Sequence, residues 1–266
     1  DKIEPVSLDE AYLDVTDSNL FCGSATLLAK QIRDDIFNKT GLTASAGIAP
    51  NKFLAKMASE WEKPNGQYTI APDDIKDFMQ QLPLSKLPGI GAKTATSLER
   101  KGYKICSDVQ ATDLFSLRRR IGNYAHRLYE LSFGFDDNDV ITHWQRKSLG
   151  VEETFENDLS VEEGLLEIDD LHQELERRFK KYLTKEKNAL SHKAFVKIKT
   201  HDFKQHTLEK VLDFDLKDIP ALADYSVMLK ELLDKFSTSV LLIGLGVRLS
   251  YEDGPKQLDI DYNQAI

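Results

Sequence analysis

The sequence has 266 residues and a mass of 30.2 kDa, which is long enough for two or three domains. Hydrophobic residues make up 41%, charged residues make up 30% and the mean hydropathy is -0.40, values that exclude a disordered chain. No stretch approaches the roughly 20 apolar residues of a membrane span, so that class is excluded as well. The only two cysteines, Cys22 and Cys106, lie far apart in the sequence and support neither a disulfide framework nor a zinc site, so a reducing cytoplasm is the simplest compartment.

The net charge of -9 is distributed unevenly along the chain. Nine Lys and Arg residues stand against four acidic residues over positions 85–132, whereas positions 152–176 hold eleven acidic residues and no Lys or Arg. Positions 185–204 are basic again, with six lysines against two acidic residues. Nucleic-acid binding depends on neutralising phosphates, so both basic stretches are candidate surfaces for it, although each alone is also typical of a solvated face.

The first 71 residues alternate strand and helix patterns, which indicates an α+β arrangement. We expect strand, helix, strand and helix in turn over Val6–Val15, Ser24–Asn38, Leu42–Ala49 and Asn51–Trp61. The pattern then becomes almost entirely helical up to Phe133, with glycine turns at Pro88–Gly91 and Ile121–Asn123. This second region is expected to form a small helical module.

A polar stretch is expected to link that module to a second α+β domain. Its predicted elements are strand Lys147–Phe155, helix Val161–Leu183, strands Lys193–Thr200 and His206–Leu212, helix Ala221–Phe236 and strand Val240–Ser250. The last sixteen residues lose the periodicity and are expected to form a tail. The chain is therefore predicted to be α+β and multi-domain, divided at 1–71, 72–135, 136–147, 148–250 and 251–266.

An acidic pair, Asp9 and Glu10, stands within the predicted first strand. Asp and Glu are depleted in strand interiors, so the pair needs a reason, and binding of divalent cations for phosphoryl transfer is one. Neighbouring strand residues point to opposite faces, however, so both carboxylates reach one site only at a turn or bulge. From these residues alone, an exposed strand end explains the pair as well as a catalytic metal site does.

A Pro-Gly-X-Gly turn within Leu87–Thr94 is the second candidate site. Such a turn leaves backbone N–H groups free at the start of the following helix, where the helix dipole also favours a phosphate. Lys93 stands just inside that helix. A nucleotide-binding P-loop is disfavoured, because Ala92 replaces the glycine that should precede the lysine. A tight turn that needs glycine only for its geometry is the alternative.

The strand predicted around Lys193–Lys199 is the third candidate. Lys193, Phe195, Lys197 and Lys199 share one face, and the small and aliphatic residues between them share the other. The first face can follow a phosphate backbone, and an edge strand protected by lysines is the ordinary alternative.

Four motifs in one order resemble the DinB-type Y-family DNA polymerases: Ser7–Asp14, Ser45–Ala49 with Asn51-Lys52, Lys63–Gly66 and Leu87–Thr94. The resemblance spans nearly the whole chain and implies low-fidelity, DNA-templated nucleotide addition opposite damaged bases. It implies a partial ferredoxin-like palm, an all-α thumb with a helix-hairpin-helix, and a little finger with a four-stranded sheet and two helices. It also implies a cytoplasmic monomer that binds primer–template DNA, deoxynucleoside triphosphates and a sliding clamp.

The resemblance also implies roles for particular residues. Asp9 and Glu10 match the acidic pair that holds two Mg²⁺ ions at a palm hairpin turn, and Lys63 matches a lysine on the nucleotide's triphosphate. Contacts to the DNA backbone are implied for Gly89, Gly91, Lys93, Arg146, Lys147, Lys193, Lys197 and Lys199. In the tail, a clamp-binding peptide is implied for Gln257, Leu258 and Ile260. That peptide departs from the family pattern, with Asp261-Tyr262 in place of the usual final aromatic residue or leucine.

The family's amino-terminal portion supplies another catalytic aspartate, a residue that excludes ribonucleotides, and the fingers. None of it precedes Asp1, so we expect the chain to begin inside a longer protein and to be inactive or nearly so by itself. A non-catalytic DNA- and clamp-binding module is the alternative function. A repair glycosylase is a further reading, for which Asp108 and Asp113 are only generic candidates for the catalytic acid.

Overall fold

A computed structural model describes residues 2–236 and 239–252 of the chain. These residues form two compact units that divide between Trp144 and Gln145, and each unit is described by itself. The mixed α and β content is that predicted from the sequence. Within the described ranges, no helix combines the length and the apolar character needed to cross a lipid bilayer.

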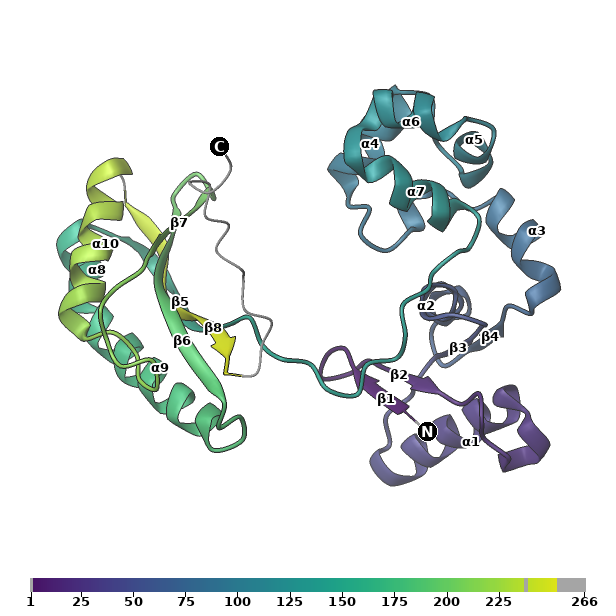
Figure 1. Cartoon of the computed structure of the whole chain (residues 1–266), viewed down its shortest axis with the longest axis horizontal. Coiled ribbons are helices and arrows are strands. Elements are labelled where there is room, and N and C mark those ends of the chain that lie inside the picture. Colours follow the sequence, from purple (N-terminus) through teal and green to yellow (C-terminus); the bar gives the residue numbers. More distant parts are fainter. Residues whose placement is uncertain (1, 237–238, 253–266) are drawn as a thin grey trace, which may run out of the picture. The chain divides into compact units, whose positions relative to one another are not determined.

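The first unit begins with short strands and two helices and continues with helices alone. Its elements are β1 (Lys2–Pro5), β2 (Ala11–Asp14), η1 (Leu20–Gly23), α1 (Ala25–Thr40), β3 (Ala46–Ile48), α2 (Lys52–Trp61), β4 (Gln67–Thr69), η2 (Pro72–Asp74), α3 (Ile75–Gln80), η3 (Leu84–Lys86), α4 (Ala92–Arg100), α5 (Cys106–Gln110), α6 (Leu114–Ile121), η4 (Gly122–Tyr124) and α7 (Ala125–Ser132). Figure 1 shows β1 and β2 as a hairpin and α4–α7 gathered as a helical layer.

The strands of this unit differ from the prediction. The expected single strand Val6–Val15 is wrong: the chain instead forms an antiparallel hairpin, β1 with β2, whose turn lies between Pro5 and Ala11. The turn forms because Glu10 O accepts the N–H group of Val6 at 2.9 Å. The predicted second strand shrinks to β3, which pairs in parallel with β4, a strand the sequence pattern did not reveal.

One buried apolar cluster runs from α2 through α7. It includes Leu54 and Met57 of α2, Met79 of α3, Leu117 of α6 and Leu128 of α7, each at most 4% exposed. Burial of aliphatic side chains of this size stabilises a fold by about 1.5–3 kcal/mol each. Helix α2 therefore belongs to the same core as the helices that follow it.

The segment after α7 is attached to α2. Asp136, only 5% exposed at its side chain, accepts hydrogen bonds from Arg127 Nη2 of α7 at 2.7 Å and from Phe53 N of α2 at 3.3 Å. Asn51 Nδ2 also donates to Gly134 O at 2.9 Å. We call residues 134–141 the strap. The strap overlaps the polar linker that the sequence predicts over residues 136–147, and it joins α7 to the amino-terminal end of α2.

The second unit is an antiparallel four-stranded sheet with helices on one face, as Figure 1 shows. Its elements are β5 (Ser148–Leu159), α8 (Val161–Leu166), α9 (Ile168–Leu183), β6 (Ala189–Thr200), β7 (Gln205–Lys210), α10 (Leu222–Phe236) and β8 (Val240–Tyr251). The strand order is β5-β8-β6-β7, so the last strand lies between the first two. We call the side of the sheet that faces away from the helices the open face.

The single helix predicted over Val161–Leu183 is wrong, because it is interrupted at Glu167 and forms α8 and α9. Helix α8 lies close to the sheet: a Cβ at Gly164 would stand 3.0 Å from Ile243 Cδ1. The chain turns at Glu167 and restarts as α9, which places Leu175 and Phe179 in the core with no exposed surface. The interruption therefore lets both helices cover the same sheet.

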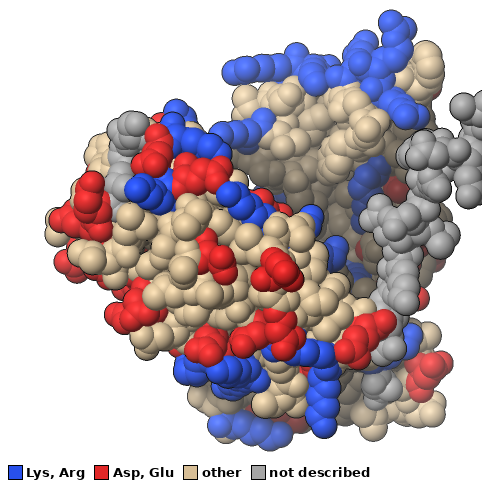
Figure 2. All heavy atoms as spheres, turned by 60° about the vertical axis from the view of Figure 1, so that its left-hand side comes forward, with Lys and Arg blue, Asp and Glu red and all other residues tan. Residues whose placement is uncertain are grey.

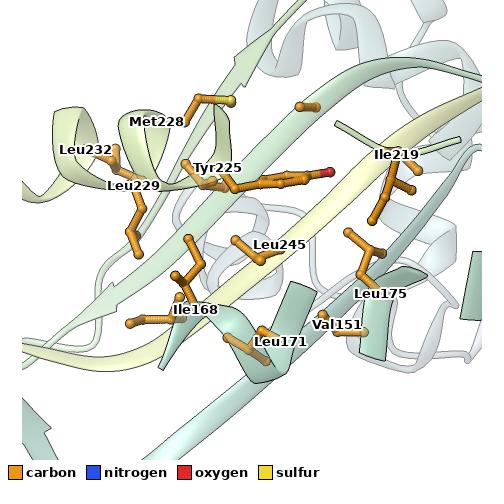
Figure 3. Packing of buried hydrophobic residues seen from close by; sticks show 14 of the residues in the cluster. Val151, Ile168, Leu171, Leu175, Ile219, Tyr225, Met228, Leu229, Leu232 and Leu245 are labelled. Carbon is orange, nitrogen blue, oxygen red and sulfur yellow. The ribbon is translucent and has the colours of Figure 1, made fainter. Parts of the chain in front are cut away.

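The core of this unit lies between the sheet and its three helices. Figure 3 shows Tyr225 of α10 lying across the sheet among aliphatic side chains from α9, β5 and β8. Tyr225 is fully buried, and its hydroxyl donates to Gly246 O at 3.1 Å. The hydrogen bond satisfies a polar group that would otherwise be costly to bury.

Candidate functional site

Asp9 and Glu10 lie at the turn of the β1–β2 hairpin and not inside a strand. The carbonyl of Glu10 accepts hydrogen bonds from the N–H groups of Val6 at 2.9 Å and Ser7 at 3.2 Å. Ser7 Oγ donates to Asp9 Oδ1 at 2.6 Å. The turn removes the geometric objection to a shared site, since side chains in a turn do not alternate between two faces as they do in a regular strand.

Lysines in and after α2 face this turn. Lys56 Nζ pairs with Glu10 Oε1 and lies 3.3 Å from Glu60 Oε1. Lys63 Nζ donates to the same Glu60 oxygen at 2.7 Å. The hydrogen bond from the neighbouring serine is the main cause that lowers the pKa of Asp9, and Lys63 and Lys56 add to it. The bond to Glu10 raises the pKa of Lys56, so this cluster holds charged groups of both signs.

The oxygen atoms at this turn suit a hard divalent cation, because such ions prefer carboxylate ligands. Asp9 is exposed at the hairpin, and the side chain of Glu10 is 40% exposed. Glu10 pairs with Lys56, and the positive charge of Lys56 also helps to lower the pKa of Asp9. Among the described residues, no three His, Cys, Asp or Glu side chains are grouped to hold a metal ion. Asp9 and Glu10 therefore fit as part of a cation site and do not complete one.

The Lys63–Gly66 loop is held by α1 and by the end of α2. Arg33 of α1 donates through Nη2 to Asn65 Oδ1 at 2.9 Å. Gly66 lies directly against the backbone of Glu62, since a Cβ at this position would be 1.6 Å from its carbonyl oxygen. Only glycine permits such an approach. These contacts hold the loop against α1 and the end of α2.

The glycine hairpin before α4 has a free amino-terminal helix end. Gly89 has a φ of +86°, which favours glycine. Gly91 is the N-cap of α4, no side chain caps the helix, and a Cβ at Gly91 would meet nothing within 4 Å. The positive φ explains Gly89, whereas the open space around Gly91 leaves the backbone at the start of α4 accessible. Lys93 is the second residue of α4, and its side chain is exposed.

Exposed cations gather over the helices around this hairpin. Figure 2 shows Lys and Arg side chains along the upper edge of the body that carries α4–α7. The exposed residues on these helices and the connections between them are Lys93, Arg100, Lys101, Lys104, Arg118, Arg119 and Arg120. A local concentration of positive charge attracts a polyanion even when the chain as a whole is negative.

The alternation predicted for β6 is confirmed. Ala194, Val196 and Ile198 are fully buried, and the residues between them are partly exposed on the open face. Lys197 Nζ lies 2.5 Å from Glu152 Oε2, and Lys199 Nζ lies 5.0 Å from the centroid of a phenylalanine ring in the β6–β7 turn. The open face therefore carries the expected lysines, and one of them is engaged by a carboxylate.

Arg146 and Lys147 precede β5, and both are exposed. The guanidinium of Arg146 lies 5.8 Å from the ring centroid of Tyr182, and its carbonyl accepts a hydrogen bond from Tyr251 Oη at 2.9 Å. The two tyrosine hydroxyls are 2.6 Å apart. Lys147 O accepts the N–H group of Leu249 at 2.9 Å. These contacts attach both cations to the beginning of the sheet.

The structure brings Asp9, Glu10 and Lys63 together around α2, as one cluster. Sequence reasoning did not find Lys56 or Glu60, which join the acidic pair to Lys63. Their spacing of four residues on a helix, followed by a lysine three residues later, was the available signal.

On the open face, sequence reasoning did not find Arg248 of β8 or its partner Glu209 of β7. Alternation along β8 places Arg248 on the same face as Gly244 and Gly246, and that pattern could have identified it. The residues predicted to bind a clamp, Gln257, Leu258 and Ile260, lie outside the described residues.

Three segments of the chain match sequence profiles of one family. Residues 1–60 match the impB/mucB/samB family, and residues 146–260 match the C-terminal domain of that family. Residues 72–103 match the IMS family HHH motif. The match to the HHH motif covers the glycine hairpin and the basic helix α4.

Curated relatives agree with these profiles. A DNA polymerase IV of Mannheimia succiniciproducens is 42% identical over 263 residues, which cover 98% of this chain and 72% of the relative. A DNA polymerase IV of Colwellia psychrerythraea is 50% identical over 210 residues, which cover 79% of this chain and 58% of the relative. The matches thus span about three fifths to three quarters of the relatives' lengths.

Solved structures are similar in fold. A Y-family DNA polymerase chimera of Dbh and Dpo4 has a TM-score of 0.78 and 28% identity, with 93% of this chain and 71% of that chain covered. A Dbh ternary complex has a TM-score of 0.59 and 27% identity, with 94% and 73% covered.

Proposed function

Because the chain belongs to the DNA polymerase IV group of the Y-family DNA polymerases, we propose that it serves DNA-templated nucleotidyl transfer in translesion synthesis. The observation that carries the proposal is the hairpin turn at which Asp9 and Glu10 stand beside Lys56 and Lys63. Carboxylates next to lysines suit a reaction that transfers a phosphoryl group, because its transition state carries charge on several oxygens.

We assign Asp9 and Glu10 to the binding of divalent cations, which this family uses, and specifically of Mg²⁺. Such ions, when bound, make a primer 3′-hydroxyl a better nucleophile and offset the charge on the departing pyrophosphate. Lys63, held by Glu60, would contact the triphosphate of the incoming nucleotide. A lysine charge that is present before the reaction begins stabilises the negative charge that develops on the triphosphate in the transition state.

We assign the grip on DNA to two further places. The first is the Gly89–Lys93 hairpin, within a thumb of residues 72–135, whose free N–H groups suit a phosphate. The second is the open face of a little finger of residues 148–250, preceded by a linker of residues 136–147 that ends in Arg146 and Lys147. Residues 1–71 would then be palm and residues 251–266 a tail.

Substitution of the acidic pair tests the proposal in a polypeptide of the relatives' full length that contains this chain. We expect Asp9→Asn with Glu10→Gln to slow primer extension at least ~100-fold, since lost electrostatic stabilisation of that size is typical. DNA affinity should stay within about twofold, because the phosphate contacts lie elsewhere. Unchanged primer extension would refute the catalytic role and would favour a non-catalytic module that binds DNA and a clamp.

We also propose that the 266-residue chain is inactive or nearly so by itself. Within the described residues no third carboxylate is placed with Asp9 and Glu10 so that the group could hold a metal ion, and a two-metal site needs more ligands than two. Robust primer extension by this polypeptide with Mg²⁺ would contradict this expectation.

Further partners follow from the family and from the tail sequence. We propose that the chain acts as a monomer in the cytoplasm and that its substrates are primer–template DNA and deoxynucleoside triphosphates. We also propose that Gln257, Leu258 and Ile260 bind a sliding clamp. Loss of clamp binding on replacing Leu258 and Ile260 with alanine, measured by calorimetry, would support the last assignment, and retained binding would refute it.

A further inference from the structure

The open face of the second unit carries cations that are already matched by carboxylates. The register places Lys193, Phe195, Lys197 and Lys199 of β6 on this face, with Arg248 beside them on β8. Lys197 Nζ lies 2.5 Å from Glu152 Oε2 of β5, and Arg248 Nε donates to Glu209 Oε1 of β7 at 2.9 Å. The two ion pairs therefore cancel two of the four positive charges on the face.

Each pair reaches across a strand that lies between its partners. Lys197 crosses β8 at Gly244, where a Cβ would stand 3.1 Å from Glu152 Cβ and 3.6 Å from Lys197 Cβ. Arg248 crosses β6 at Phe195, and its guanidinium lies 5.0 Å from that ring's centroid. Because Gly244 has no side chain and the Phe195 ring lies flat, neither residue blocks the long side chain that crosses it. Both cations therefore lie along the surface of the sheet.

The Phe195 ring is itself fixed by the glycines around it. A Cβ at Gly246 would be 2.2 Å from Phe195 Cζ, and a Cβ at Gly150 would be 3.1 Å from the same atom. The ring therefore lies flat over the backbone of β8 and extends toward β5. It forms a platform that holds the Arg248 guanidinium at a defined place, by a cation–π contact.

The two carboxylates on this face, Glu152 and Glu209, contribute little to the stability of the fold. The side chains of Glu152 and Glu209 are 52% and 35% exposed, and exposed ion pairs contribute little to folding stability. Glutamate is also depleted in strands. On a surface that binds DNA, each carboxylate opposes binding, because a cation must leave it before it contacts a phosphate.

We propose that Glu152 and Glu209 limit the affinity of this face for DNA. They hold Lys197 and Arg248 in the free protein, and each cation exchanges its carboxylate for a backbone phosphate when DNA binds. The exchange keeps the grip weak and reversible, which suits a protein that must release the duplex. The inference rests on the proposed function, because the partner is the phosphate backbone of primer–template DNA.

The test measures binding of the 266-residue chain to a fluorescein-labelled primer–template duplex by anisotropy between about 50 and 200 mM NaCl. We expect Glu152→Gln and Glu209→Gln each to tighten binding about 3- to 10-fold at the lowest salt. In the wild type the cation must leave a carboxylate, which then takes up a Na⁺ ion and offsets the ion released from the phosphate, whereas in the variants no such carboxylate is present. The slope of log affinity against log salt should steepen by about 0.9 per variant, so the gain shrinks about 3.5-fold at the highest salt.

Glu176→Gln is the matched control. Glu176 pairs with Lys180 within α9, on the helix-covered side of the sheet, so the substitution changes net charge equally. We expect the control to change affinity by less than about 1.5-fold, because charges farther than a Debye length from the DNA are screened.

The same measurement in an Arg248→Gln variant distinguishes release of the cation from simple repulsion between Glu209 and the DNA phosphates. With Arg248→Gln already present, Glu209→Gln should gain no more than the control, because no cation remains to be released. An equal gain in that background would overturn the proposal, as would Gln variants that bind no more tightly than the wild type. If the unsubstituted chain shows no salt-dependent DNA binding, the proposed binding of DNA by this face is refuted, and the role proposed for Glu152 and Glu209 is refuted as well.

Discussion

Asp136 in the strap offers a sharp test of how the first unit is held together. Its side chain is 5% exposed and accepts hydrogen bonds from Arg127 Nη2 at 2.7 Å and from Phe53 N at 3.3 Å. The first bond joins the strap to α7, and the second satisfies a backbone donor in the first turn of α2. Asp136→Ala removes both bonds at once, together with a bond that Asn138 Nδ2 donates within the exposed part of the strap.

The expected loss follows from these two contacts. A lost cap at a helix amino terminus costs about 1 kcal/mol, and a lost hydrogen bond to a charged group costs about 1.5–3 kcal/mol. Arg127 is 38% exposed and can be hydrated again, so we expect the lower part of the combined range. The free energy of unfolding of the first unit should fall by about 2–3 kcal/mol.

Tryptophan fluorescence during urea denaturation measures this loss selectively. The chain's two tryptophans, Trp61 and Trp144, both belong to the first unit, so the signal reports that unit alone. Tyr225→Phe removes a buried hydrogen bond in the second unit and should leave the tryptophan transition in place. A change below about 0.5 kcal/mol for Asp136→Ala, which is usual for surface substitutions, would refute the role given to the strap.

Three further predictions concern the same unit. Burial alone would raise the pKa of Asp136, but the hydrogen bonds from Arg127 and Asn138 outweigh burial and lower this pKa. The stabilisation of the first unit by Asp136 should therefore be present above about pH 4 and disappear as acid protonates the carboxylate. The wild type and Asp136→Ala should then have the same free energy of unfolding in urea denaturation at low pH. Gly47→Ala should destabilise the unit by about 1–3 kcal/mol or more, because a Cβ there would lie 2.0 Å from Ala55 O; a neutral result in the same assay would show that α2 can move away from β3. A thiol reagent should label only the exposed Cys22 in the native chain, since burial raises the pKa of Cys106 to about 12, and a second equivalent should react only in denaturant.

Local patterns in the sequence were sufficient for much of the secondary structure. Helix α1 begins after Ser24, whose side chain accepts the Leu27 N–H group, and α2 begins after Asn51 in the same way. The alternation along β6 likewise identified its buried and basic faces. These features depend on residues within a few positions of one another, so the amino-acid order alone determines them. The motifs also identified the family, because their order and spacing are properties of the sequence.

Only the tertiary structure decided how separate segments combine. The hairpin turn at Asp9 and Glu10, the parallel pairing of β4 with β3, and the interruption between α8 and α9 all differ from the local pattern. Pairs such as Arg248 with Glu209 join different strands. Such contacts arise because burying apolar surface sets the path of the whole chain, and that path brings together charges whose positions in the sequence say nothing about their distance.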